Sequence, residues 1–228
     1  MNVNSKANNY MVNPMQTIFT SLAISLVFMG LGFLFGIFFV PIQVAYMANR
    51  LIGIVFIGLI VLSMFSRKSV IPRSFPIGFV YGFTFIYGVI LYPVLMYYLQ
   101  ALGAPVFFSV IAGAIVLFAI LAFQASRKEA GYYMSMGNVL FAGLIAIIVA
   151  SVINIFVFSS FVSVIISAVS VVIFAAYVMY DISIMKMALN SGYVRDKNDL
   201  SIFVLNLYLD LINLILNLLN IAGYLDNR

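Results

Sequence analysis

Long apolar runs alternate with short polar connectors along the whole chain. Because a helix needs about 20 apolar residues to cross a bilayer, the runs predict seven membrane-spanning helices, at residues 17–40, 51–65, 77–99, 106–123, 132–157, 161–188 and 202–222. The second run is short, and only Phe158, Ser159 and Ser160 separate the fifth from the sixth, so a six-helix arrangement stays open as the alternative. The pattern predicts an all-α membrane protein with one domain at 17–222, between a polar N-terminal tail at 1–16 and a short C-terminal tail at 223–228.

The basic residues predict how these helices are oriented, since cytoplasmic loops are enriched in Lys and Arg. With the N-terminus in the cytoplasm, the outer segments would hold only Arg50 and Arg228. The inner segments would hold the others, which are Lys6, Arg67, Lys68, Arg73, Arg127, Lys128, Lys186, Arg195 and Lys197. This bias fits seven spans, with the C-terminus outside. The short polar ends, without an evident targeting segment, suggest the plasma membrane of a bacterium.

Composition agrees with a membrane protein and narrows its chemistry. Charged residues make up only 7% of the chain, whereas a soluble domain carries about 25%. The basic residues that give the net charge of +5 lie at the predicted helix ends, so they indicate membrane topology rather than nucleic-acid binding. Without cysteine or histidine, the chain has no thiolate metal site and no ordinary neutral-pH switch. An enzyme is not expected, because no serine has an evident base and the Gly-x-Gly-Asp motif of intramembrane aspartyl proteases is missing from the sequence.

The seventh apolar run carries a row of polar residues, which are Asn206, Asp210, Asn213, Asn217 and Asn220. Intervals of 4, 3, 4 and 3 place them on one face of a helix whose other faces are Leu, Ile and Val. An ionisable group at such depth costs roughly 2.5–3.5 kcal/mol. We therefore expect Asp210 to have a function, although the row could equally form an amide ladder between helices.

The sixth run has a second row at helical spacing, which leads from Asp181 back through Tyr177, Phe174, Ser170, Ser167 and Ser163. At 1.5 Å per residue, Asp181 lies about 10 Å from the inner end of its helix, and Asp210 about 13–14 Å from the start of the next. The connector at 189–200 is long enough for two antiparallel helices. Both carboxyls are therefore expected at one depth, where they can meet.

Two adjoining carboxylates would repel each other by about 4 kcal/mol at 4 Å and an effective dielectric constant near 20. The pair would therefore share one proton, and it could sense pH without histidine. When fully ionised, Asp181 and Asp210 could also bind Ca²⁺, which prefers carboxylate and carbonyl oxygens. Protons and Ca²⁺ would then compete for the same atoms. The structural alternative is that each buried aspartate only joins helices through a hydrogen bond.

Small residues and a proline predict details of helix packing. Gly32 with Gly36, and Gly78 with Gly82, form two Gly-x-x-x-Gly motifs, which favour close approach of helices. Pro93 is expected to interrupt the third helix, as a structural kink or as a hinge near a pore.

Three segments resemble a known family. Residues 180–182 (YDI) and 207–214 (LYLDLINL) strongly resemble the transmembrane Bax inhibitor motif family, and 79–85 (FVYGFTF) through Tyr92-Pro93 is similar to its third helix. The resemblance covers roughly residues 15–223 and implies seven helices, with the seventh central within a ring of six. It also implies a relation to bacterial pH-sensitive calcium leak channels. In those, aspartates matching Asp181 and Asp210 form the proton-sensing pair. An arginine after the second helix is the latch on that pair. Arg67 matches it, with Arg73 as the alternative.

These observations lead to one functional hypothesis and two alternatives. The hypothesis is a passive, pH-sensitive Ca²⁺ leak channel in the bilayer of the plasma membrane. Asp181 and Asp210 would be the sensor and cation site, and the polar row of Asn206, Asn213 and Asn217 would lie beside them. Ca²⁺ and protons are the expected ligands, with no resident cofactor. The alternatives are a non-conducting regulator that binds another membrane protein, such as a protease, and a proton-coupled transporter.

Overall fold

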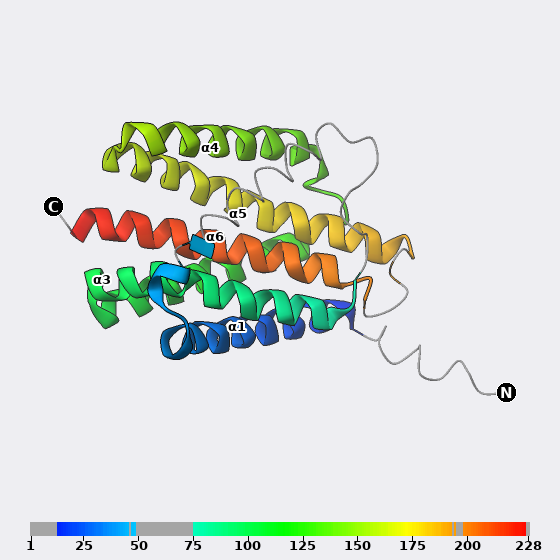
Figure 1. Cartoon of the computed structure of the whole chain (residues 1–228). Helices are drawn as coiled ribbons and strands as arrows, with labels where there is room; N and C mark the ends of the chain where they lie inside the picture. Colours follow the sequence, from blue (N-terminus) through cyan, green and yellow to red (C-terminus); the bar gives the residue numbers. More distant parts are fainter. Residues whose placement is uncertain (1–12, 46, 49–74, 193, 195–197, 227–228) are drawn as a thin grey trace. The chain divides into compact units, whose positions relative to one another are not determined.

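Figure 1 shows the computed structural model of the chain, which describes residues 13–45, 47–48, 75–192, 194 and 198–226. Over these ranges the regular structure is helical, without a strand. Its elements are α1 (Pro14–Phe39), α3 (Ile77–Arg127), the 3₁₀ turn η2 (Met134–Met136), α4 (Gly137–Val157), α5 (Ser160–Asn190) and α6 (Ser201–Asp226). They form two compact units. One combines Met1–Met96 with Val194–Leu205, and the other combines Tyr97–Tyr193 with Asn206–Arg228.

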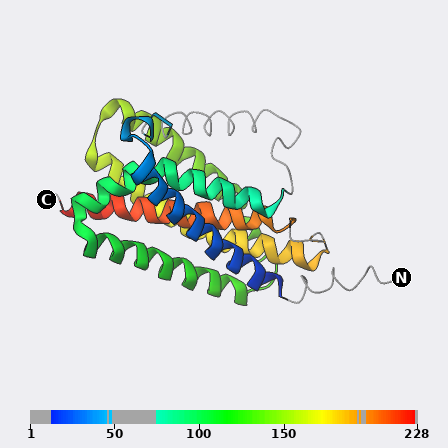
Figure 2. The same ribbon diagram turned by 60° about the horizontal axis from the view of Figure 1, so that its bottom comes forward.

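In the first unit, α1 packs against the first half of α3, and the two lie side by side in both views (Figures 1 and 2). The two helix backbones are in contact, because a Cβ added to Gly32 would collide with the carbonyl group of Phe85. A Cβ added to Gly88 would collide with the carbonyl group of Met29. The close packing of helices expected around Gly32 is confirmed, and Gly88 supplies the matching surface on α3.

The remaining motif glycines differ from one another. Gly36 lies against the ring of Tyr92, whose hydroxyl donates a hydrogen bond to the Val40 carbonyl oxygen at 2.6 Å. This bond satisfies a carbonyl just beyond the end of α1. No described residue lies within 4 Å of a Cβ added to Gly78 or Gly82, so a packing role for the second motif stays a prediction.

The helix break in α3 lies at Gly103 and not at Pro93. Gly103 has φ 72° and ψ 158°, which are not helical, and it divides α3 into two apolar segments that correspond to the third and fourth predicted spans. Pro93 lies within continuous helix, so the expectation that it interrupts the third helix is wrong. A residue without a Cβ adopts such backbone angles at little cost, which explains why the break falls at the glycine.

The boundary between α4 and α5 falls at the three residues expected to separate the fifth and sixth spans. Phe158 ends α4 in the left-handed region at φ 53°. Ser159 then caps α5, because its hydroxyl accepts a hydrogen bond from the Val162 backbone N–H at 3.3 Å. A serine N-cap satisfies one of the free N–H groups of the first helical turn. The sharp change of direction between the two helices is visible in Figure 1.

Six of the seven predicted spans coincide with described helices, counting α3 as two. The expected second span, at 51–65, lies outside the described residues, so the ring of six around the seventh helix stays a prediction. Within the described residues, five helices are long and apolar enough to cross a membrane. Half of the most apolar stretch of α6 is buried, against 6–22% in the other helices. Large apolar side chains cover the exposed faces of the other helices, including Phe38 on α1 and Phe156 on α4. This distribution is typical of helices that face lipid, and α6 is the most buried of the five.

Candidate functional site

The polar rows of α5 and α6 face each other along most of their length. We call this surface the polar interface; on α5 it comprises Ser163, Ser167, Ser170, Tyr177 and Asp181, and on α6 Asn206, Asp210, Asn213, Asn217 and Asn220. Asn206 is bonded to Asp181, and Asn220 to Ser167. Asn220 lies 14 residues after Asn206, and Ser167 lies 14 residues before Asp181. The two helices are therefore antiparallel and in register over about 21 Å.

We call the two ends of the polar interface inner and outer, after the orientation that the basic residues predict. The inner end holds two buried acids. The exposed fractions of Asp181 and Asp210 are 9% and 6%. The Asn206 side-chain amide donates a hydrogen bond to the Asp181 carboxyl. The two carboxyls interact electrostatically with one another, and the phenol of Tyr177 interacts with both. That the two acids share a proton as a sensing pair stays a prediction.

One oxygen of Asp210 stands out within this cluster. Its Oδ2 is buried and has no hydrogen-bond partner among the residues that the structure describes. A buried carboxyl oxygen without a partner is costly, because the interior does not replace the hydrogen bonds that water would supply. The atom is therefore available to a proton, a cation or a donor from another part of the chain. The two arginines considered as a latch, Arg67 and Arg73, lie outside the described residues.

Among the described residues, no hydrogen bond of an amide ladder joins α5 and α6 in the middle of the polar interface. The Asn213 amide donates to the Leu209 carbonyl oxygen, and the Asn217 amide donates to the Asn213 carbonyl oxygen, both at 2.8 Å. Each bond runs to the residue four positions earlier in the same helix. On α5, Ser170 likewise donates to the Ile166 carbonyl oxygen at 2.8 Å. The side chains of these residues donate hydrogen bonds to carbonyl groups of their own helix. Over the described ranges, the hydrogen bonds between α5 and α6 therefore lie at the two ends of the polar interface.

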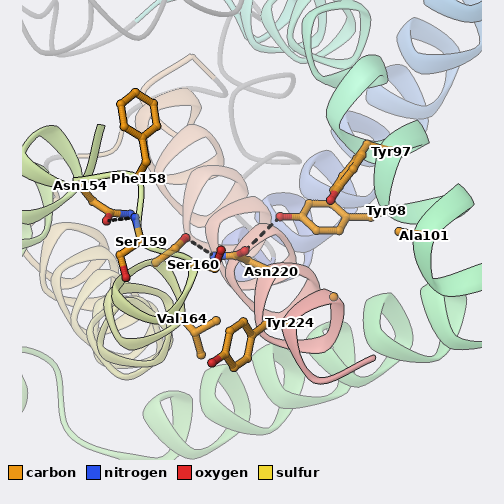
Figure 3. Close-up of a pocket in the computed structure, with 12 residues that line it drawn as sticks. Tyr97, Tyr98, Ala101, Asn154, Phe158, Ser159, Ser160, Val164, Asn220 and Tyr224 are labelled. Carbon is orange, nitrogen blue, oxygen red and sulfur yellow. Dashed lines mark hydrogen bonds between the residues drawn. The ribbon is translucent and has the colours of Figure 1, made fainter. Parts of the chain in front are cut away.

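At the outer end, Asn220 connects three segments. Its amide nitrogen lies 2.9 Å from the Ser163 hydroxyl and 2.7 Å from the Ser167 hydroxyl, both on α5. Its carbonyl oxygen accepts a longer bond, of 3.4 Å, from the hydroxyl of Tyr98 on α3. Figure 3 shows Asn220 at the base of a pocket, with the Tyr98 hydroxyl directed toward it.

That pocket has a volume of about 380 Å³ and opens between α3, the α4–α5 turn and α6. Its polar lining groups are neutral: phenols, hydroxyls and side-chain amides. Tyr97 and Phe158 at its edge are 57% and 87% exposed, whereas Ser167 beneath Asn220 is 4% exposed. The pocket is thus an open, uncharged depression that ends at the outer end of the polar interface.

Beyond the acids, the last turns of α5 hold the connector between α3 and α4. The Lys186 ammonium donates to the carbonyl oxygens of Ser126, at 2.7 Å, and Lys128. Ser183 accepts from the connector as well, through its carbonyl oxygen from the Gly131 N–H and through its hydroxyl from the Tyr133 N–H. A cation at the end of α3 also fits the negative end of that helix dipole.

The described residues offer few ligands for a metal. No group of three or more acidic side chains gathers among them. Because Ca²⁺ takes six to eight oxygen ligands, a Ca²⁺ at Asp181 and Asp210 would need amide or carbonyl oxygens and water as well. Such a donor set suits an ion in transit better than a tightly held one.

Sequence reasoning named most of these residues but missed one connection. It did not include Tyr98, whose hydroxyl donates a hydrogen bond to the side-chain oxygen of Asn220. No spacing rule relates residues this far apart in sequence. Gly223, one turn after Asn220, could have indicated this contact, because the Tyr98 ring packs against a residue that has no side chain.

Long apolar helices that bury a polar interface define a multi-pass helical membrane protein. A family model described as Inhibitor of apoptosis-promoting Bax1 matches residues 11–227, nearly the whole chain. The chain therefore belongs to the Bax inhibitor family. This match confirms the resemblance stated for residues 180–182 and 207–214.

Proposed function

We propose that the protein is a pH-sensitive Ca²⁺ leak channel in the plasma membrane, controlled by the buried acids Asp181 and Asp210. The observation that carries this proposal is the inner cluster. Two buried carboxyls interact there, and one oxygen, Asp210 Oδ2, lacks a hydrogen-bond partner among the described residues. Membership of the Bax inhibitor family supports it.

The chemistry follows from the competition between protons and cations for carboxylate oxygens. With one proton shared, the pair carries a single negative charge and offers fewer oxygens to Ca²⁺. With both groups ionised, it becomes a hard-oxygen site that a passing Ca²⁺ can occupy. Asn206, which donates to Asp181, would hold that carboxyl in place in both states.

A counter-charge completes the proposal. Arg67, or Arg73 in its place, would pair with the ionised acids and hold the path closed, as a cytoplasmic latch. The N-terminus would lie in the cytoplasm and the C-terminus outside, as the distribution of basic residues predicts. Comparison of Arg67→Gln with Arg73→Gln distinguishes the two arginines, because only loss of the latch should increase flux.

Flux measurements on purified protein in liposomes loaded with a Ca²⁺ dye test the proposal. Asp210→Asn keeps the shape of the side chain but removes its titration. We expect the flux to change by about tenfold or more, the effect of about 1.4 kcal/mol on a barrier, and to lose its dependence on pH. Asp226→Asn is the matched control, since Asp226 is an exposed acid at the end of the same helix.

The other outcomes are equally specific. An Asp210→Asn variant with unchanged flux and pH profile would overturn the mechanism. Purified protein without flux, together with a stoichiometric membrane-protein partner in a pull-down, would favour a non-conducting regulator. Counterflow of a labelled solute driven by a proton gradient would favour a proton-coupled transporter.

A further inference from the structure

The neutral pocket at the outer end of the polar interface has no role in proton sensing, because none of its twelve lining residues carries an ionisable carboxyl or a basic group. It nevertheless reaches Asn220, which joins α5 and α6 by hydrogen bonds near their outer ends. We propose that this pocket is the water-filled outer mouth of the permeation path, and that Asn220 closes it. The inference rests on the proposed function for the existence of a path.

The position of Asn220 supports a closing role. It lies six residues before the end of α6, or about 9 Å along the helix axis, where the open pocket meets the buried part of the polar interface. Immediately below it, Ser167 and Ser170 are 4% and 1% exposed. The change from an open pocket to buried serines therefore takes place at a single side chain.

The bonds of Asn220 explain how one side chain can close the path. Its amide bridges two successive turns of α5, at Ser163 and Ser167, and its carbonyl oxygen accepts from Tyr98. These contacts fix the amide across the gap between the helices. Asn213 and Asn217, in contrast, donate only to carbonyl oxygens of α6 itself. They do not hold the helices together through those bonds.

The lining chemistry indicates what the mouth admits. Phenol, hydroxyl and amide oxygens can replace some of the water around a hard cation, but without fixed charge they bind it weakly. A path that conducts passively needs an entrance of this kind, where an ion enters easily and leaves easily. Discrimination by charge would then take place deeper, at the two acids.

The chain has no cysteine, so a single introduced cysteine reports accessibility without background. Ser170→Cys places a thiol of nearly the same size at the buried position below Asn220, and Ser160→Cys places one at the exposed edge of the pocket. A small, positively charged, membrane-impermeant methanethiosulfonate is added from outside, and the labelling rate is measured by intact mass. We expect fast labelling at position 160 and none at position 170.

Asn220→Ala combined with Ser170→Cys is the decisive variant. We expect labelling at position 170 to become about tenfold faster or more, the effect of losing two to three interhelical hydrogen bonds of the strength found in membrane proteins. Asn217→Ala with Ser170→Cys is the matched control. It removes an asparagine one turn deeper while the bonds of Asn220 stay intact, so position 170 should stay unlabelled.

Folding is checked separately. Ser160→Cys must be labelled at the same rate with and without Asn220→Ala, and Asn220→Ser, which cannot reach both serines, should give an intermediate rate at position 170. Equal rates for Asn220→Ala and Asn217→Ala, or no acceleration with Asn220→Ala, overturn the inference. Labelling as expected without Ca²⁺ flux would overturn the leak and leave the mouth standing. Normal Ca²⁺ flux without the labelling pattern would overturn the closing role of Asn220 and leave the leak channel standing.

Discussion

The two ends of the polar interface use different chemistry to join the same pair of helices. At the inner end, Asp181 and Asp210 are buried acids, and an amide donates to one of them. At the outer end, a neutral amide, Asn220, bonds to two hydroxyls beside an open pocket. Groups that can carry charge are buried, and groups that cannot carry charge meet the solvent-accessible space, which is the reverse of a stability-driven arrangement.

The burial of the charged groups, rather than the neutral ones, indicates where the functional groups lie. A chain that needed only to hold α5 against α6 could use serine and asparagine throughout, as it does at the outer end. Burial of ionisable groups within a membrane protein is expensive and is retained where the groups act. Under the proposed function, the outer end would control access, and the inner end would control the response to protons and cations.

The largest effect on stability is expected when the Asn220 amide loses one of its two hydroxyl acceptors on α5. Ser167→Leu removes a hydroxyl that lies 2.7 Å from the Asn220 amide and inserts a larger side chain into a buried site. We expect a loss of about 2–4 kcal/mol, from the one amide N–H that loses its acceptor and from overpacking. SDS-induced unfolding in bicelles measures it. Ser160→Leu, at an exposed position of the same helix, is the control and should change little.

The inner end should respond less in stability and more in activity. Asn206→Ala removes the donor to the Asp181 carboxyl, at a cost of about 1–2 kcal/mol. Because the donor also stabilises the ionised form of Asp181, the pH profile of Ca²⁺ flux should shift as well. Asn213→Ala, whose amide bonds only to its own helix, should leave that profile unchanged. If both variants shift the profile equally, the distinction between the ends and the middle is wrong.

The sequence predicted the spans and both polar rows because apolar length and helical period are local properties. It therefore predicted Asp181, Asp210 and the serines of α5 on facing surfaces, which the bonds of Asn206 and Asn220 now join. It did not predict that Asn213 and Asn217 bond within their own helix, because the same spacing allows both arrangements. The break at Gly103 lies in the predicted connector between the third and fourth spans. The interruption expected at Pro93 was wrong, because a proline can continue within a membrane helix when its neighbours satisfy the freed carbonyl.

A smaller effect is expected from the connector that is fixed beside the inner end. Lys186→Met removes the ammonium that donates to the carbonyl oxygens of Ser126 and Lys128, but it keeps the length of the apolar stem. We expect a loss of about 1 kcal/mol, from the hydrogen bonds and the helix-end charge. Limited proteolysis should then cut the connector at 128–133 faster. No change in the cutting rate would show that Ser183 alone holds the connector.

The smallest effect is expected at the turn between α4 and α5, which borders the outer pocket. Phe158 holds a left-handed backbone at φ 53° and is 87% exposed, so its side chain contributes little packing within the chain. Phe158→Gly should relieve the strain of that conformation and lose some chain entropy, with a net gain of about 0.5 kcal/mol. The midpoint of SDS unfolding measures it, and Phe158→Ala, which keeps the strain, serves as the control. A gain that Phe158→Ala reproduces would mean that the exposed ring, and not the backbone conformation, is the unfavourable feature of this turn.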